Sequence, residues 1–269
     1  MSNKLRIALI GKTGNGKSST GNMILQRKQF ECAASANGVT FRIQSEFGHF
    51  QNSDFKLTDT PGVFDPVKSD EEIINELKKV IDELHPGPHV FLIVLKSTRF
   101  TEEDKMSVKV LGDIFGQEVF KHSIVVFTRI DDLTADGSNL STYVNTSVNE
   151  NLRDLLNKCN NRYVGFNNRI SYDSNENQQQ VRELFEKIDQ VINSDMGNYF
   201  KGEIFEYTTQ NIQNRKEAVI NSPDLTPSEK TNKLDQIEAN VNTFFTNLTG
   251  IFAGVRALIG MFKMLCNVV

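Results

Sequence analysis

The sequence predicts an α/β fold in which a mostly parallel β-sheet is flanked by helices and followed by a C-terminal helical extension. Two observations support this. Short, continuous apolar segments alternate with amphipathic segments, which is typical of parallel sheets covered by helices on both faces. In addition, residues Gly11–Ser18 read GKTGNGKS between a predicted strand and a predicted helix, which matches the phosphate loop (P-loop) of nucleoside triphosphatases.

The expected elements follow in order along the chain. Strands are predicted where short apolar, often β-branched segments lie between turn residues, at Leu5–Ile10, Thr40–Phe47, Asp54–Leu57, His89–Leu95 and Ser123–Phe127. Helices are predicted from about Lys17 and wherever apolar residues recur at helical spacing, at Glu71–Leu84, Glu102–Phe115 and Leu140–Cys159. Right-handed crossovers would bring the carboxyl ends of the parallel strands, and any ligand site, to one edge.

The P-loop predicts a binding site for a nucleoside triphosphate. Its glycines let backbone N–H groups face an anion without a Cβ clash, and the following helix points the positive end of its dipole at the phosphates. Lys17 is expected to reach the β- and γ-phosphates, and the Ser18 hydroxyl to ligate Mg²⁺. The predicted nucleotide contacts here are Gly11, Lys12, Thr13, Gly14, Asn15, Gly16, Lys17, Ser18 and Ser19.

An acidic turn, Asp59-Thr60-Pro61-Gly62, follows the third expected strand. Asp59 is expected to hold Mg²⁺ through a water molecule, and the backbone N–H of Gly62 to lie near the γ-phosphate. Thr40 would add a second hydroxyl to the metal while the γ-phosphate is present, and would thereby order its loop. The predicted metal ligands are thus Ser18, Thr40 and Asp59. Plain turn and strand roles compete with these assignments, because the same residue types are common there.

A second motif predicts the base. Residues 128–132 read Thr-Arg-Ile-Asp-Asp, which resembles the [Asn/Thr]-Lys-x-Asp guanine motif. A carboxylate there can accept both N1–H and the exocyclic amine of guanine, donors that adenine does not offer on that edge. Either Asp131 or Asp132 could be that carboxylate. A later Asn-Asn pair, expected before or at the start of the next strand, could close over guanine or form an ordinary turn. The predicted base contacts are Thr128, Arg129, Asp131, Asp132, Asn167 and Asn168.

Length and composition exclude other classes. The 269 residues are 38% hydrophobic and 24% charged, which is ordinary for a globular protein and unlike a disordered one. The net charge of −4 gives no general reason to expect nucleic acid as a partner. Cys32, Cys159 and Cys266 lack metal-ligand spacing and are expected to be reduced thiols. The polar start of the chain does not resemble a secretory leader, which predicts a cytoplasmic protein.

Several segments together resemble the AIG1 family of GTPases, which includes the immunity-associated nucleotide-binding proteins. They are Gly11–Asn22, Asp59–Phe64, His85–Asp104, Phe127–Leu133 and Arg162–Arg169. The resemblance covers about Lys4–Val191 and implies a P-loop NTPase G domain of the septin- and chloroplast-import-receptor-like class. It further implies that GTP and GDP bind with Mg²⁺, that a homodimer forms through the nucleotide face, and that the C-terminal region attaches to membranes. Ile130-Asp131 departs from the Lys-Glu pair of many members, and Gly165 from their Ala.

Hydrolysis is expected to be slow in the isolated chain. Val63 follows Gly62, where many small GTPases carry the glutamine that orients the attacking water, and valine cannot form that hydrogen bond. By resemblance, Arg99 is the candidate for an arginine supplied across a dimer, although it could equally pair with the acidic residues that follow it. Lys17 and Arg99 are the predicted catalytic residues. A GTP-dependent membrane scaffold with negligible hydrolysis is the alternative function.

The sequence predicts a G domain over residues 1–195, a helical extension over 196–249 and an amphipathic hydrophobic tail over 250–269. In the extension, helices are expected at Asn198–Asn221 and Ser228–Leu248, separated by a linker with two prolines. In the tail, a broad apolar face opposes a stripe that contains Arg256 and Lys263. This pattern favours a helix lying in a membrane surface over a spanning helix. Packing on the protein or on a second subunit is the alternative. Cys266 occupies the prenylation position, but the residues after it are unusual for that signal.

Overall fold

The computed structural model describes residues 4–32, 43–60, 70–98, 100–147 and 149–266. Its central feature is a six-stranded sheet in the order β2-β3-β1-β4-β5-β6. The strands are β1 Leu5–Ile10, β2 Gln44–Phe50, β3 Ser53–Asp59, β4 Val90–Lys96, β5 Ser123–Thr128 and β6 Tyr163–Phe166. The β2–β3 pair is antiparallel, and the other neighbouring strands of this sheet are parallel. The prediction of a mostly parallel sheet with one strand pair is confirmed.

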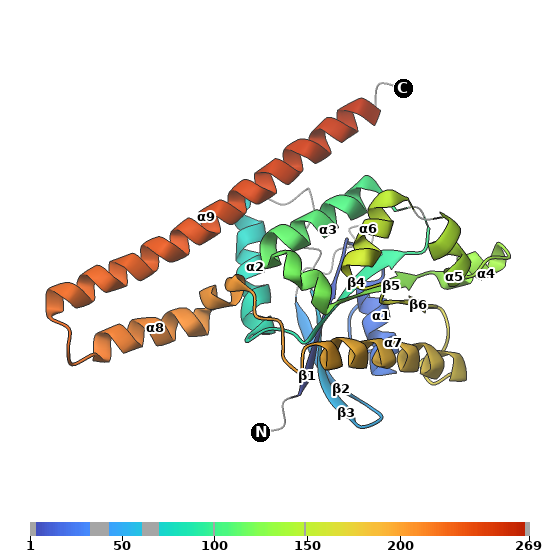
Figure 1. Cartoon of the computed structure of the whole chain (residues 1–269), viewed down its shortest axis with the longest axis horizontal. Coiled ribbons are helices and arrows are strands. Elements are labelled where there is room, and N and C mark those ends of the chain that lie inside the picture. The colour runs from blue at the N-terminus through green and yellow to red at the C-terminus, as the bar shows by residue number, and fades with distance from the viewer. Residues whose placement is uncertain (1–3, 33–42, 61–69, 99, 148, 267–269) are drawn as a thin grey trace.

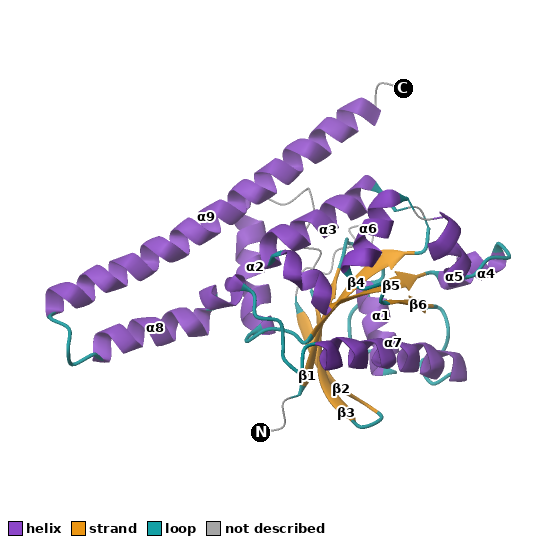
Figure 2. Ribbon diagram, in the orientation of Figure 1, coloured by secondary structure: helices purple, strands orange, loops and turns teal. Residues whose placement is uncertain are grey.

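Helices cover both faces of this sheet (Figures 1 and 2). Along each strand, alternate side chains enter different cores because successive residues point to opposite faces. In β4, Phe91, Ile93 and Leu95 pack against α2, α3 and α6, whereas Leu92 and Val94 pack against α1 and α7. The helices are α1 Lys17–Leu25, α2 Asp70–Leu84, α3 Glu102–Phe115, α4 Ile130–Ala135, α5 Leu140–Thr142, α6 Glu150–Lys158, α7 Asn175–Ser194, α8 Thr209–Asn221 and α9 Pro227–Cys266.

Four sequence-based expectations need correction. In the extension, the helix expected at Asn198–Asn221 begins at Thr209, after a short 3₁₀ helix over Glu203–Tyr207. The other three lie in the sheet domain. First, Asn167 and Asn168 follow the short strand β6 and do not precede a strand. Second, the helix expected over Leu140–Cys159 is divided into α5, a π-helical segment over Tyr143–Ser147, and α6. A separate helix starts here because Asn149 is the N-cap of α6: its side chain accepts the backbone N–H of Leu152 at 3.0 Å. Third, the strand expected from Thr40 begins at Gln44 within the described residues.

The C-terminal extension is a helical hairpin of α8 and α9 (Figure 1). Helix α9 is continuous over 40 residues, so the helix expected at Ser228–Leu248 and the predicted tail helix belong to one element. It packs across α2 and α3, with Phe245 and Leu248 buried. Phe244 stacks on Tyr207 with ring centroids 3.8 Å apart, and Lys78 Nζ of α2 lies 4.4 Å from the Phe245 ring centroid. None of the described helices is both long and apolar enough to cross a membrane.

Candidate functional site

The P-loop connects β1 to α1 at the carboxyl edge of the sheet. Gly11, Gly14 and Gly16 have φ values of 147°, 84° and 96°, in the region that favours glycine. A Cβ on Gly11 would lie 2.5 Å from the carbonyl oxygen of Val94, so the loop can lie this close to β4 only without a side chain. These backbone conformations suit an anion-binding loop, in which successive N–H groups face the ligand.

Lys17 begins α1 and is buried, with 7% of its surface exposed. Its Nζ donates to the carbonyl oxygens of Gly11 at 2.8 Å and Lys12 at 3.2 Å. The ammonium therefore lies against the P-loop, where phosphate oxygens could replace these carbonyls as acceptors. Burial lowers the pKa of Lys17 to about 8, and the nearby charge of Asp59 partly opposes this shift.

Asp59 ends β3 and is fully buried beside the P-loop. Its Oδ2 accepts the Ser18 hydroxyl at 2.5 Å. Burial raises the pKa of Asp59, while the bond from Ser18 and the charge of Lys17 act in the opposite direction. A buried carboxylate beside a serine hydroxyl is a pair of oxygen ligands, which suits a hard cation such as Mg²⁺. The other groups predicted near the metal and the γ-phosphate lie outside the described residues. They are Thr40, Gly62 and the catalytic candidate Arg99.

Four buried polar side-chain atoms lack a hydrogen-bond partner among the described residues, and three of them are acceptors at this edge. They are Asp59 Oδ1, Asp131 Oδ1 and Asn168 Oδ1, which we call the open acceptors. Burying an unsatisfied polar group costs about 1–3 kcal/mol. The open acceptors therefore point to a ligand that brings hydrogen-bond donors or a cation.

The base motif adjoins the P-loop directly. Thr128 ends β5, and its Oγ1 donates to the carbonyl oxygens of Asn15 at 2.9 Å and Leu95 at 3.2 Å. Arg129 then adopts a left-handed conformation, with φ 61°, from which α4 begins. A Cβ on Gly16 would lie 3.2 Å from Asn168 Nδ2 and 3.4 Å from Thr128 Cγ2. The P-loop and the predicted base residues Thr128 and Asn168 therefore lie next to each other.

The geometry distinguishes Asp131 from Asp132. The Asp131 side chain is 20% exposed and carries an open acceptor, whereas Asp132 is 38% exposed. Arg169 Nη1 donates to Asp131 Oδ2 and, at 2.8 Å, to Asp132 Oδ1. Arg129 Nη1 lies 3.9 Å from Asp132 Oδ2. Asp131 is therefore the carboxylate with a buried oxygen available to a base.

The two asparagines also differ. Asn167 Oδ1 accepts the backbone N–H of Arg169 at 3.0 Å, which is the hydrogen bond of an ordinary Asx turn. Asn168 Nδ2 donates to Thr20 Oγ1 of α1 at 3.0 Å, and its Oδ1 is an open acceptor. Asn168 is therefore the better candidate for a base contact.

Some predicted contacts use their side chains elsewhere. Asn15 Nδ2 donates to the Val94 carbonyl at 3.0 Å and to Asp104 Oδ1 of α3 at 3.1 Å, and Lys12 pairs with Glu103. Ser19 Oγ donates to Cys32 Sγ at 3.5 Å. These P-loop residues could contact a nucleotide through their backbone. The contributions of α3 and Arg169 are not predicted by any sequence motif, although Arg169 ends one of the segments that carry the family resemblance.

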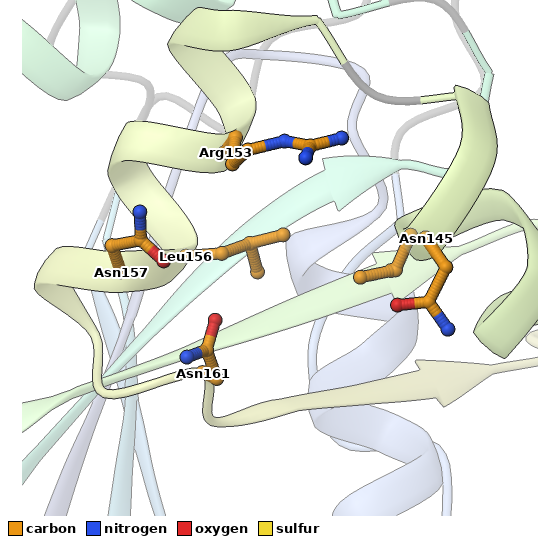
Figure 3. A pocket seen from close by; sticks show the side chains of 6 residues that line it. Asn145, Arg153, Leu156, Asn157 and Asn161 are labelled. Carbon is orange, nitrogen blue, oxygen red and sulfur yellow. The ribbon is translucent and has the colours of Figure 1, made fainter.

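A separate pocket of about 200 Å³ lies beside α6. Figure 3 shows its lining, in which Arg153, Leu156 and Asn157 come from α6. Asn145 comes from the π-helical segment, and Asn161 precedes β6. Within the part of the chain that the structure describes, none of the predicted site residues lines this pocket.

Comparison with known proteins adds to this geometry. A family model described as "AIG1 family" matches residues 5–220. The chain is 30% identical to immune-associated nucleotide-binding protein 9 of Arabidopsis thaliana over 243 residues, which are 89% of this chain and 70% of that protein. The alignments span 70%, 40% and 65% of the lengths of the first three curated relatives.

Solved structures show the same fold. Toc33 from Arabidopsis thaliana, in complex with Mg²⁺ and GMPPNP, has a TM-score of 0.55 at 18% identity over 71% of this chain and 85% of Toc33. A second structure has a TM-score of 0.55 at 18% identity over 70% of this chain and 83% of its own. Its description states that dimerization is important for the GTPase activity of the chloroplast translocon components atToc33 and psToc159.

Proposed function

Because this chain belongs to the AIG1 family, we propose that it is a guanine-nucleotide-binding protein that binds GTP and GDP with Mg²⁺ and hydrolyses GTP. The observation that carries the proposal is the set of open acceptors at one edge of the sheet. One lies beside the P-loop and two lie beside the base motif, so a single nucleotide could satisfy all three. Its base would supply the donors, and Mg²⁺ would supply the positive charge.

The base end suits guanine better than adenine. An ionised carboxylate only accepts hydrogen bonds. Guanine offers Asp131 two donors, N1–H and the 2-amino group, whereas adenine offers an acceptor at N1. The N1 lone pair of adenine would therefore face the carboxylate, which would be left without a donor. A site that leaves a buried polar group unpaired with the wrong ligand rejects that ligand strongly. Asn168 and the Arg129 side-chain stem would complete the base contacts.

At the phosphate end, Lys17 and the backbone N–H groups of the P-loop would hold the phosphates. Ser18, Asp59 and Thr40 would hold Mg²⁺, which neutralises charge that develops on the transferred phosphoryl group. Lys17 would remain charged against the phosphates although burial lowers its pKa in the free protein. Its role is to orient the γ-phosphate and to stabilise its charge.

Hydrolysis is proposed to be slow in a single chain and to depend on pairing of two copies through the nucleotide face. Val63 cannot orient the attacking water, so another group must assist. Arg99 of a second copy would supply a guanidinium to the transferring phosphate, which can be worth about 10³-fold or more. The dimerization described for atToc33 and psToc159 supports this proposal. Val63 also favours the second candidate function, a GTP-dependent scaffold with negligible hydrolysis.

The C-terminal segment is proposed to associate with the cytosolic face of a membrane. Residues 251–266 contain two charged residues, Arg256 and Lys263, among mostly apolar ones. A helix with an apolar face and isolated basic residues suits the interface between lipid headgroups and acyl chains.

The test of nucleotide binding and hydrolysis is phosphate release from GTP, titrated against protein concentration, with calorimetry for GTP, GDP and ATP. We expect guanine nucleotides to bind and ATP to compete poorly. Turnover per chain should rise with protein concentration if pairing completes the site. Absence of heat with both guanine nucleotides would contradict nucleotide binding, and assembly with GTP without phosphate release would favour the scaffold function.

Liposome flotation tests the membrane proposal. The full chain is compared with a variant that carries Leu258→Asp and Phe262→Asp, which introduces charge on the predicted apolar face. We expect the double variant to float less than the unmodified chain. Equal flotation of the two would contradict membrane association through this segment.

A further inference from the structure

Arg169 joins the base motif to the loop after β6. Its Nη1 donates to Asp131 Oδ2 and to Asp132 Oδ1, and the sequence separation between Arg169 and Asp131 is 38 residues. The backbone N–H of Arg169 is in turn fixed by Asn167 Oδ1. The arginine is thus anchored at its backbone as well as at its guanidinium.

The bridge, by which we mean the bonds from Arg169 to Asp131 and Asp132, gives the two oxygens of Asp131 different surroundings. Arg169 occupies Oδ2, while Oδ1 is an open acceptor within the described part of the chain. A carboxylate rotates about its terminal bond with a broad preference, so a charge-assisted bond to one oxygen fixes the direction of the other. The bridge also offsets the repulsion between two adjacent carboxylates.

We propose that Arg169 is a positioning residue for guanine recognition: it holds Asp131 Oδ2 and thereby directs Asp131 Oδ1 toward the N1–H of the base. The inference rests on the proposed guanine-nucleotide function and adds a specificity determinant to it. Arg169 does not touch the base in this role and acts through Asp131. Its removal should therefore weaken guanine binding without affecting contacts to the phosphates.

An ordinary surface ion pair would make a different prediction. The Arg169 side chain is 61% exposed, and exposed pairs have small effects on stability. If the bridge were only such a pair, loss of Arg169 would leave base selectivity unchanged. Selectivity for guanine over adenine therefore separates the positioning role from a merely structural one.

The experiment measures dissociation constants of GDP and ADP, both with Mg²⁺, for the full chain and for Arg169→Ala. We expect the GDP constant to rise about three- to tenfold, as for loss of one partly exposed charge-assisted hydrogen bond, and the ADP constant to stay unchanged. The selectivity ratio, defined as the ADP constant divided by the GDP constant, should fall by the same factor. Arg169→Lys should lower this selectivity less than Arg169→Ala does, because an ammonium can still pair with one carboxylate. Arg182→Ala, which removes an exposed arginine from α7, is the matched control and should leave both constants unchanged.

A further variant tests the bridge itself. Asp132→Asn weakens one of the two anchors of Arg169, so it should lower the ratio less than Arg169→Ala does. The double variant should be no worse than Arg169→Ala alone, because both changes act through the same orientation of Asp131.

An unchanged ratio in Arg169→Ala, or equal weakening of GDP and ADP, would overturn the inference. Fully additive effects in the double variant would overturn it as well. Failure of the proposed function is distinguishable, because the unmodified chain would then show no preference for GDP over ADP.

Discussion

At the scale of single residues, Lys17 has the chemistry that depends most on its surroundings. Its ammonium is buried against two carbonyl oxygens of the P-loop, and its pKa is lowered to about 8 because burial disfavours the charged form. Bound phosphates would surround the same ammonium with negative charge and would raise this pKa again. Nucleotide binding should therefore be coupled to protonation of Lys17.

This coupling predicts proton uptake at high pH. At about pH 9, Lys17 would be mostly neutral in the free protein and charged in the nucleotide complex. Nucleotide binding should then take up close to one proton. The affinity for nucleotide should fall by up to about tenfold per pH unit above pH 8. Near pH 7.5, uptake should be much smaller. Calorimetry of GDP binding in two buffers with different ionisation enthalpies measures the number of protons. Heats at pH 9 that do not depend on the buffer would contradict the prediction.

Asp131→Asn should shift the base preference from guanine to xanthine. The asparagine amide can donate to the carbonyl oxygen that xanthine carries in place of the 2-amino group of guanine. Loss of charge-assisted bonds to guanine should weaken GDP binding by about tenfold or more. Xanthosine diphosphate (XDP) should bind the variant more tightly than it binds the unmodified chain. Competition between GDP and XDP measures the shift. Asp132→Asn is the matched control, and a shift in that variant alone would assign the base to Asp132.

His89 should make folding sensitive to mild acid. It is buried, its Nδ1 accepts the Arg6 N–H at 3.0 Å, and burial, with the charges of Arg6 and His122, lowers its pKa to about 4. The folded chain therefore binds fewer protons than the unfolded chain between about pH 4 and 6.5. The free energy of unfolding should then fall as pH falls through that window, by about 2 kcal/mol between pH 7 and 5.

Urea unfolding at both pH values tests the prediction for His89. His89→Asn keeps an acceptor for Arg6 and cannot titrate, so its free energy of unfolding should change less between pH 7 and 5. An equal change in the two proteins would show that other groups cause the acid sensitivity.

At the scale of secondary-structure elements, Ile130 and Gly165 lie close to each other, and both depart from the family pattern. A Cβ on Gly165 of β6 would lie 2.8 Å from Cγ2 of Ile130 in α4 and 3.0 Å from Cδ2 of Leu140 in α5. The isoleucine thus fills space that a larger residue at 165 would need. Ile130 itself packs against the hydrophobic core on this face of the sheet, and α4 also carries Asp131.

Gly165→Ala should therefore destabilise the protein by about 1–3 kcal/mol, as overpacking of a filled core does. Ile130→Ala removes the clashing carbons, so the double variant should lose less stability than the sum of the single variants. Urea unfolding of all four proteins measures the coupling. Additive losses would show that residues 130 and 165 do not compete for the same space.

At the scale of the whole molecule, α9 joins the C-terminal hairpin to the sheet domain. Phe245 is buried between α9 and α2, and the neighbouring Phe244 stacks on Tyr207. Ile237 and Leu248 of α9 are buried as well, whereas none of the described residues of α8 is buried. A small number of aromatic and aliphatic side chains, most of them from α9, therefore anchors the extension.

Phe245→Ala should lower the free energy of unfolding by about 3–5 kcal/mol, because it removes a buried aromatic side chain and leaves a cavity. It should also expose α8 and α9 to limited proteolysis before the sheet domain is cut. Thr246→Ala, at an exposed position on the same helix, is the control and should change stability by about 0.5 kcal/mol or less. Equal protease resistance of the two variants would contradict the anchoring role of Phe245.

The sequence by itself determined the sheet class and the family, and it predicted the residues of the candidate phosphate site. These signals are contiguous: Gly11–Ser18 and Asp59 follow strands whose apolar character is visible without any long-range information. It missed β6 because four residues with a glycine carry a weak strand signal. It also extended one helix over Leu140–Cys159, because an N-cap at Asn149 leaves the apolar spacing on either side almost unchanged.

Only the tertiary structure favoured Asp131 over Asp132 and Asn168 over Asn167. Neighbouring residues of the same type have nearly the same local pattern, and their difference arises from which side chain is buried against other elements. Arg169 reaches Asp131 across 38 residues of sequence, and Asn168 reaches Thr20 across 148. Such contacts depend on how parallel strands bring distant loops to one edge, so the spacing of residues along the chain cannot reveal them.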